Sequence, residues 1–120
     1  MQPIKKYDLE ERLLQFAVSV INLIEDLPDG KISNYLGSQL LRSGTSPALN
    51  YGEAQAAESK KDFVHKLKII LKELRETCIC LTILQHKSLI KNTDVTKENK
   101  ELIAIFSKSI ETAEGNLDNS

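Results

Sequence analysis

Two histidines and two cysteines are the side chains of this sequence best suited to metal binding or nucleophilic chemistry. His65 and His86 lie 21 residues apart on one predicted helix, about 30 Å by helical rise, so they cannot share a metal ion. Cys78 and Cys80 are two positions apart, which directs them about 200° apart around a helix and prevents a disulfide between them. Both lie on or near the apolar side of that helix, which favours core packing over nucleophilic catalysis. We therefore predict no catalytic residue, no metal site and no cofactor.

A row of polar residues follows the second predicted helix at spacings of three or four positions. If that helix is continuous, one face carries Gln39, Arg42, Ser46, Asn50 and Glu53. Buried polar side chains require hydrogen-bond partners, so a network that fixes helix register or a subunit contact is favoured over a ligand site. We predict a structural role for this polar row.

A row of basic residues lies within about 60° of arc on the third predicted helix. It comprises Lys61, Lys68, Lys72 and Arg75. Such a row could contact phosphates, but Glu76 is a predicted i, i+4 partner of Lys72, and no aromatic side chain is interleaved on that face to stack on bases. With 17 acidic and 16 basic residues, the chain has a net charge of −1. Nucleic-acid binding is therefore possible but not favoured.

The first predicted helix, residues 9–27, carries two apolar stripes. Asp8 and Glu11 have capping-box spacing at its start. The first stripe is a heptad seam of Leu9, Leu13, Phe16, Val20, Leu23 and Leu27. The second stripe beside it comprises Leu14, Ala17, Val18, Ile21 and Ile24. Together they span roughly 220° of the circumference, whereas a surface helix needs an apolar arc of only about 100°. The excess predicts that the second stripe is an oligomer interface.

Three further helices are predicted, over residues 31–55, 59–87 and 95–113, with Ser59 as the N-cap of the third. The segment 43–47 leaves the second helix open to two interpretations. Its local signals favour a break, whereas the apolar face keeps its phase across Pro47. Short connections favour antiparallel neighbours. The sequence therefore predicts an all-α, left-handed, up-down four-helix bundle, a single domain over residues 1–120 with frayed ends at 1–7 and 115–120.

Composition and hydropathy indicate the compartment. Hydrophobic residues make up 41% and charged residues 28%, which is too apolar for intrinsic disorder. The apolar runs are far shorter than the ~20 residues of a membrane span, and acidic residues follow Lys5 and Lys6 where a signal peptide would be apolar. Unpaired cysteines suit a reducing compartment. We expect a cytoplasmic protein without membrane contact.

Several segments resemble the bacterial four helix bundle protein family, whose founding members are encoded by intervening sequences within 23S rRNA genes. The matching segments are residues 39–46 (QLLRSGTS), 50–54 (NYGEA) and 59–63 (SKKDF), supported by 12–18 and 71–77. The resemblance extends from about Leu9 to Phe106. It implies an up-down bundle that forms a homopentameric ring, no established enzymatic activity, and a second helix that continues past Pro47.

A related branch of that family, the accessory protein of diversity-generating retroelements, partners a reverse transcriptase and binds nucleic acid through a strongly basic surface. This chain departs from that branch in its net charge of −1. We therefore predict a non-enzymatic, self-assembling scaffold or accessory subunit whose partner is itself. The alternative is an RNA- or DNA-binding accessory protein, in which a ring gathers several copies of the basic row.

Overall fold

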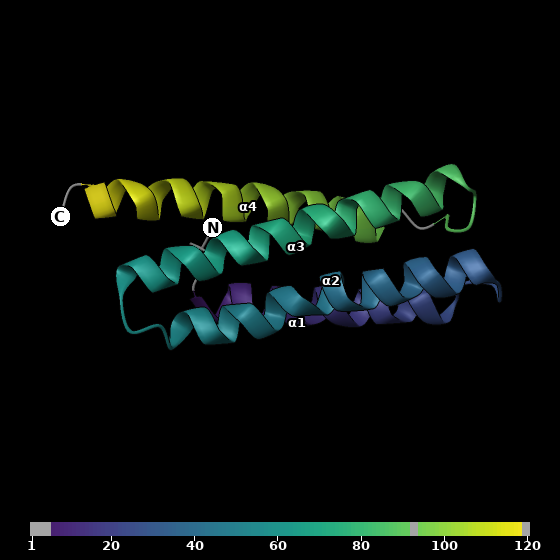
Figure 1. Cartoon of the computed structure of the whole chain (residues 1–120), viewed down its shortest axis with the longest axis horizontal. Helices are drawn as coiled ribbons and strands as arrows, with labels where there is room; N and C mark the ends of the chain where they lie inside the picture. The colour runs from purple at the N-terminus through teal and green to yellow at the C-terminus, as the bar shows by residue number, and fades with distance from the viewer. Residues whose placement is uncertain (1–5, 92–93, 119–120) are drawn as a thin grey trace.

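The computed structural model describes residues 6–91 and 94–118, and these form four helices without strands (Figure 1). The helices are α1 (Lys6–Glu25), α2 (Lys31–Gln55), α3 (Lys60–His86) and α4 (Asp94–Asp118). Short connections join successive helices, which run in alternating directions along the long axis of the molecule (Figure 1). The all-α fold is confirmed, and the handedness of the bundle stays a prediction.

The helix boundaries agree with the predicted ones for α2 and α3 and differ for α1 and α4. Ser59 caps α3, since its side-chain oxygen accepts a hydrogen bond of 3.1 Å from the backbone N–H of Asp62. The predicted cap at Asp8 is wrong, because α1 begins at Lys6 and places Asp8 in its first turn. An acidic side chain there still interacts favourably with the helix dipole.

The two ends of the chain are more helical than expected. α1 includes residues 6–7, and α4 continues to Asp118, past the predicted end at residue 113. Residues 115–118, for which we predicted fraying, are therefore helical, as are 6–7. The rest of the predicted frayed ends, 1–5 and 119–120, lies outside the described residues.

α2 is one continuous helix across Pro47, so the local prediction of a break is wrong and the continuity implied by the resemblance is confirmed. A proline inside a helix removes one backbone hydrogen bond and costs about 3 kcal/mol. Here Pro47 is itself buried, and Leu40 and Tyr51 are buried on either side of it. Because packing continues in phase on both sides, tertiary contacts offset the local penalty.

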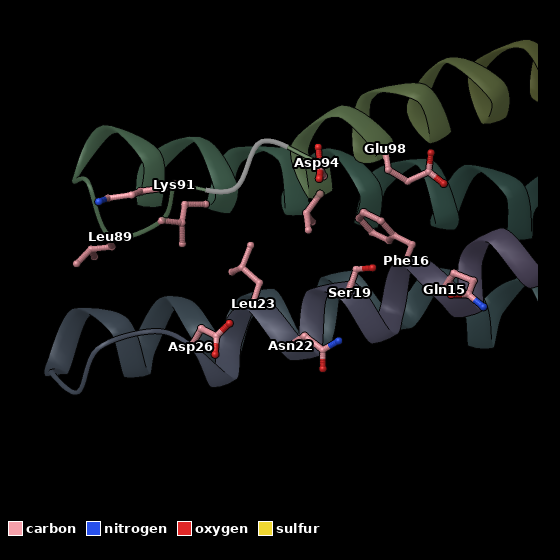
Figure 2. A pocket seen from close by; sticks show the side chains of 12 residues that line it. Gln15, Phe16, Ser19, Asn22, Leu23, Asp26, Leu89, Lys91, Asp94 and Glu98 are labelled. Carbon is pink, nitrogen blue, oxygen red and sulfur yellow. The ribbon is translucent and has the colours of Figure 1, made fainter.

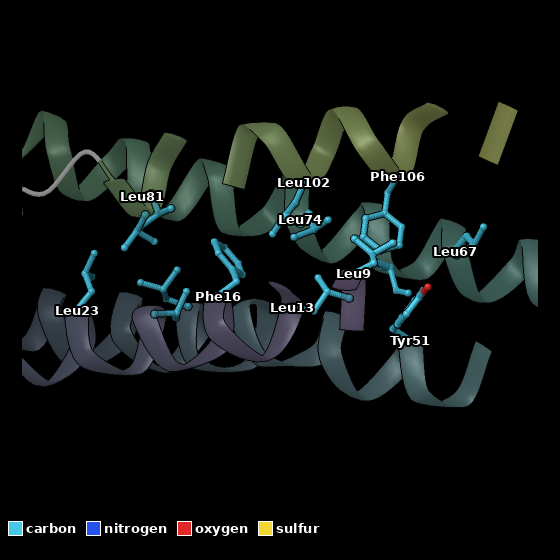
Figure 3. Close-up of a cluster of buried hydrophobic side chains, with 14 of the residues drawn as sticks. Leu9, Leu13, Phe16, Leu23, Tyr51, Leu67, Leu74, Leu81, Leu102 and Phe106 are labelled. Atoms are coloured by element: carbon cyan, nitrogen blue, oxygen red, sulfur yellow. The ribbon is translucent and has the colours of Figure 1, made fainter. Parts of the chain in front are cut away.

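One hydrophobic core runs along the bundle and takes side chains from every helix (Figure 3). The heptad seam predicted for α1 is buried here: Leu13, Phe16 and Val20 are at most 1% exposed. The rings of Tyr51 and Phe106 meet edge to face with centroids 5.9 Å apart. The packing is uneven, since α2 and α3 lie against each other extensively whereas α1 and α4 meet little.

Candidate functional site

The outer face of α1 exposes a stripe of large apolar side chains. Leu14 is 48% exposed, Val18 53% and Ile21 37%. Their spacings of four and three residues place them on one side of the helix. These three residues were predicted for an oligomer interface, and in the single chain water covers them.

The other two residues of the predicted interface are covered within the chain. Ala17 is buried, and Ile24 is half-buried beside α2, where a Cβ added at Gly37 would lie 3.5 Å from Ile24 Cγ2. The apolar arc of α1 that lacks a partner is therefore narrower than the sequence suggests. Part of the excess apolar surface serves the contact with α2 within the chain.

Leu41 of α2 extends the exposed apolar surface beyond α1. It is 46% exposed and lines a shallow hollow together with Ile24. Gly37 lies at the level of Ile24 and Gly44 at the level of Val20. Leu41, between these two glycines, is therefore at the level of Ile21, and the exposed surface is continuous across the two helices.

The polar row on α2 forms separate contacts rather than one network. Arg42 binds two carboxylates of α3, donating to Glu73 Oε2 at 2.6 Å and also to Glu76. These hydrogen bonds, with Glu76 and then Glu73 as the main causes, raise the pKa of the Arg42 guanidinium. Glu73 is buried, so Arg42 neutralises a carboxylate that water reaches poorly.

The remaining members of the polar row make shorter-range contacts. Asn50 Nδ2 donates to the hydroxyl and to the carbonyl of Ser46, at 2.8 and 3.0 Å, on its own helix. Glu53 pairs with Lys66 of α3 at 3.0 Å, and Gln39 is half-buried. Arg42 and Glu53 are exposed and reach α3 independently, and the structural role of the row stays a prediction.

The buried polar contact between α2 and α3 lies at Ser43 and Thr77. Their hydroxyls are hydrogen bonded across 2.9 Å, and both residues are fully buried. From the sequence, Ser43 was placed only within the ambiguous segment 43–47. Its small side chain was the signal, since a serine in phase with the apolar face is suited to a close, polar helix contact.

Removal of the Arg42 side chain should destabilise the fold, because it leaves the buried Glu73 carboxylate without its cation. We expect Arg42→Ala to lower the free energy of unfolding by about 1–3 kcal/mol, as for other buried polar groups that lose a partner. Chemical denaturation followed by circular dichroism measures this. Lys66→Ala, which breaks the more exposed pair with Glu53, is the matched control and should cost at most about 0.5 kcal/mol. Equal losses would contradict the assignment.

The basic row lies exposed along α3, and three of its residues border an open groove of about 470 Å³ against α4. Lys68, Lys72 and Arg75 form the rim. Lys61 is exposed but does not line the groove. Lys68 pairs with Glu114 of α4 at 3.0 Å.

The same groove has an apolar lining, which the sequence did not predict. Leu71 and Ile79 of α3 and Ile110 of α4 form it. We predicted that Lys72 pairs with Glu76 on the same helix. In the structure, the Glu76 carboxylate instead binds Arg42 of α2. The face is therefore neither a simple solvated helix surface nor a continuous row of cations.

A cleft of about 620 Å³ lies between α1 on one side and residues 89–91 and the first turns of α4 on the other (Figure 2). Glu98 lines this cleft and accepts a hydrogen bond of 3.1 Å from Arg12 of α1, which also donates to Glu101 at 3.2 Å. These contacts, above all the hydrogen bond to Glu98, raise the pKa of Arg12. The cleft follows from the limited contact between α1 and α4, which the four helical patterns did not reveal.

The polar side chains of this cleft are amides, carboxylates, one hydroxyl and the amine of Lys91. Ser19, Asn22 and Asp26 project into it from α1, opposite Asp94 and Glu98 of α4 (Figure 2). No histidine or cysteine is among the side chains that line it. Ser19 therefore lacks the imidazole that usually activates a serine nucleophile.

The histidines and cysteines line neither the cleft beside α1 nor the groove between α3 and α4. His65 and His86 are exposed, and Cys78 and Cys80 are half-buried free thiols. Burial is the main cause that raises the pKa of Cys80, which disfavours the reactive thiolate. Within residues 6–91 and 94–118, no three histidine, cysteine or acidic side chains gather closely enough to hold a metal ion.

The helical architecture and the family comparison together define the class of protein. Four helices around one apolar core make the chain an all-α bundle protein. Residues 5–111 match the family model of the 23S rRNA-intervening sequence proteins, and the chain belongs to this family. The resemblance noted in the sequence is thereby confirmed.

A solved structure with the same fold supports this assignment. The crystal structure of a protein with unknown function from the S23 ribosomal protein family of Bacteroides thetaiotaomicron has 32% sequence identity to this chain and a TM-score of 0.76. The similarity covers 84% of this chain and 96% of that one. No curated protein matches the sequence. None of the described helices combines the length and apolar content of a membrane span.

Proposed function

We propose that this protein is a non-enzymatic, self-assembling scaffold or accessory subunit that acts as a homo-oligomer. The observation that supports this proposal is the exposed apolar stripe of Leu14, Val18 and Ile21, extended by Leu41 of α2. Single exposed apolar residues are common on protein surfaces. A contiguous group on two neighbouring helices is characteristic of an interaction surface. The resemblance to the four helix bundle family suggests five subunits.

The chemistry of the described surface supports a role in assembly rather than catalysis. The cleft beside α1 contains no histidine or cysteine in its lining, and no hydrogen bond joins Ser19 to the carboxylates of Asp26 and Glu98 there. The contacts of Arg42 and Arg12 join helices to one another, α2 to α3 and α1 to α4. These arginines therefore stabilise contacts between helices of one subunit. The apolar stripe of α1, by contrast, is exposed and available to a second subunit.

A charge introduced into the stripe should dissociate the oligomer without unfolding the subunit. We expect Val18→Glu to reduce the mass in solution to that of one 13.5 kDa chain, because assembly would bury an unpaired carboxylate. Light scattering gives the mass, and circular dichroism gives the helix content. Ala104→Glu, at an exposed position of α4, is the matched control and should leave the mass unchanged. An unaltered mass for Val18→Glu would exclude this stripe as the interface.

Nucleic-acid binding is the second candidate, favoured by the exposed basic row on α3. We expect only weak, non-specific contacts, with Kd no tighter than ~10⁻⁴–10⁻⁶ M at physiological salt and a steep loss on adding salt. Lys68 is already paired with Glu114, and acidic residues outnumber basic ones. Fluorescence anisotropy with generic RNA and DNA tests this. Submicromolar binding that is lost in Lys68→Glu with Lys72→Glu would reverse the order of the two proposals.

A further inference from the structure

We propose that the subunits associate head to tail, with α1 of one copy packed into the groove between α3 and α4 of the next copy. This inference rests on the self-association proposed above and specifies its partner surface. It assigns a role to the groove, which lies away from the exposed stripe of α1. The argument depends on the match in charge and in apolar character between these two surfaces.

The surface on α1, here called the acidic-ended stripe, is one straight line of exposed side chains. It comprises Glu10, Leu14, Val18, Ile21 and Glu25. The spacings of four, four, three and four residues place all five on one side of the helix over about 22 Å. The centre is apolar, and a carboxylate lies one turn beyond each end of it. A surface that complements this stripe is apolar and carries positive charge.

The groove between α3 and α4 meets these requirements. Leu71, Ile79 and Ile110 supply an apolar lining, and Ile79 is 62% exposed. Lys68, Lys72 and Arg75 line the same groove, one helical turn apart on α3. The acidic residue of the lining, Glu76, is already bound by Arg42. Lys68 is paired with Glu114, so Lys72 and Arg75 are the cations that the groove offers beside its apolar lining.

Charge also disfavours the two symmetric alternatives. A two-fold pairing of stripe with stripe brings Glu10 of one copy to Glu25 of the other, so acidic ends meet acidic ends. A two-fold pairing of groove with groove brings Lys72 and Arg75 of one copy against those of the other. Like charges placed opposite each other across an interface are repulsive. Stripe with groove is the pairing that joins opposite charges, and such a heterologous contact builds a ring when its rotation closes.

Two variants, each with one damaged surface, test the inference. Val18→Glu damages the stripe and keeps the groove, whereas Ile79→Glu damages the groove and keeps the stripe. Both positions are exposed, so the fold should survive, as circular dichroism will show. We expect each variant alone to be monomeric. An equimolar mixture should form a 1:1 dimer of twice the 13.5 kDa chain mass and nothing larger, because one intact stripe then meets one intact groove.

Charge exchange gives an independent readout. Reversing the rim with Lys72→Glu and Arg75→Glu should weaken assembly about tenfold or more at low salt, since the stripe then meets like charge. Adding Glu10→Lys and Glu25→Lys to the same chain should restore it. Assembly that persists in Ile79→Glu, or a mixture that stays monomeric, would overturn the head-to-tail pairing while the wild-type mass still supports self-association. A monomeric wild type would overturn both proposals.

Discussion

Adding one methyl group at Gly44 should destabilise the protein, whereas the same change at Gly52 of the same helix should stabilise it. A Cβ at Gly44 would lie 2.7 Å from Cγ1 of Val20, which is fully buried on α1. Valine has little rotamer freedom within a helix, so α1 and α2 must move apart. Overpacking of this kind costs about 1–3 kcal/mol, which outweighs the gain of about 1 kcal/mol in helix propensity.

The contrast with Gly52 isolates packing from propensity. A Cβ at Gly52 meets no atom within 4 Å, so Gly52→Ala should add about 0.5–1 kcal/mol to the free energy of unfolding. Urea titrations of the two variants measure both values. In the background of Val20→Ala, the loss from Gly44→Ala should shrink, because the clashing methyl groups are gone. Stabilisation by Gly44→Ala in the wild-type background would show that α1 and α2 are not this close.

The largest loss of stability is expected for Phe106→Ala. Phe106 is fully buried on α4 and meets Tyr51 of α2 edge to face at 5.9 Å. Removing the ring leaves a cavity in the core and should cost about 3–5 kcal/mol. Tyr35→Ala, at a tyrosine that is 64% exposed, is the surface control and should change stability by about 0.5 kcal/mol or less.

If Phe106→Ala fails to fold, Phe106→Leu provides the measurement, since it keeps most of the apolar volume. We expect it to fold with a smaller loss and with the Tyr51 contact removed. A loss at Phe106 no greater than that at Tyr35 would mean that α4 does not pack across the bundle as described.

Heptad spacing predicted the core because burial repeats with the helical period. The seam of α1 from Leu13 to Leu23 is buried as expected. Heptad spacing does not decide burial at the edge of the apolar arc. There a residue is covered or exposed according to how closely the neighbouring helix approaches. Ala17 is buried, whereas Leu41 is exposed, and neither outcome follows from its own helix alone.

The partners of charged residues were predicted poorly, because they lie on other helices. An i, i+4 rule assigned Glu76 to Lys72, but the bundle places it against Arg42. The contact of Arg12 with Glu98 spans 86 residues, beyond any local rule. Asn99 lies in the buried side of α4 and donates to the carbonyl of Leu74 at 3.0 Å. A lone polar residue of this kind inside an apolar seam gives no sign in the sequence of what it binds.

The mass of the wild-type protein in solution tests self-assembly most directly. The exposed stripe on α1 and the groove between α3 and α4 each lack a partner within the described part of the chain. Light scattering at micromolar concentration should therefore give a mass several times the 13.5 kDa of one chain, and the resemblance to the four helix bundle family implies five subunits. A single species of 13.5 kDa at every concentration would contradict the account.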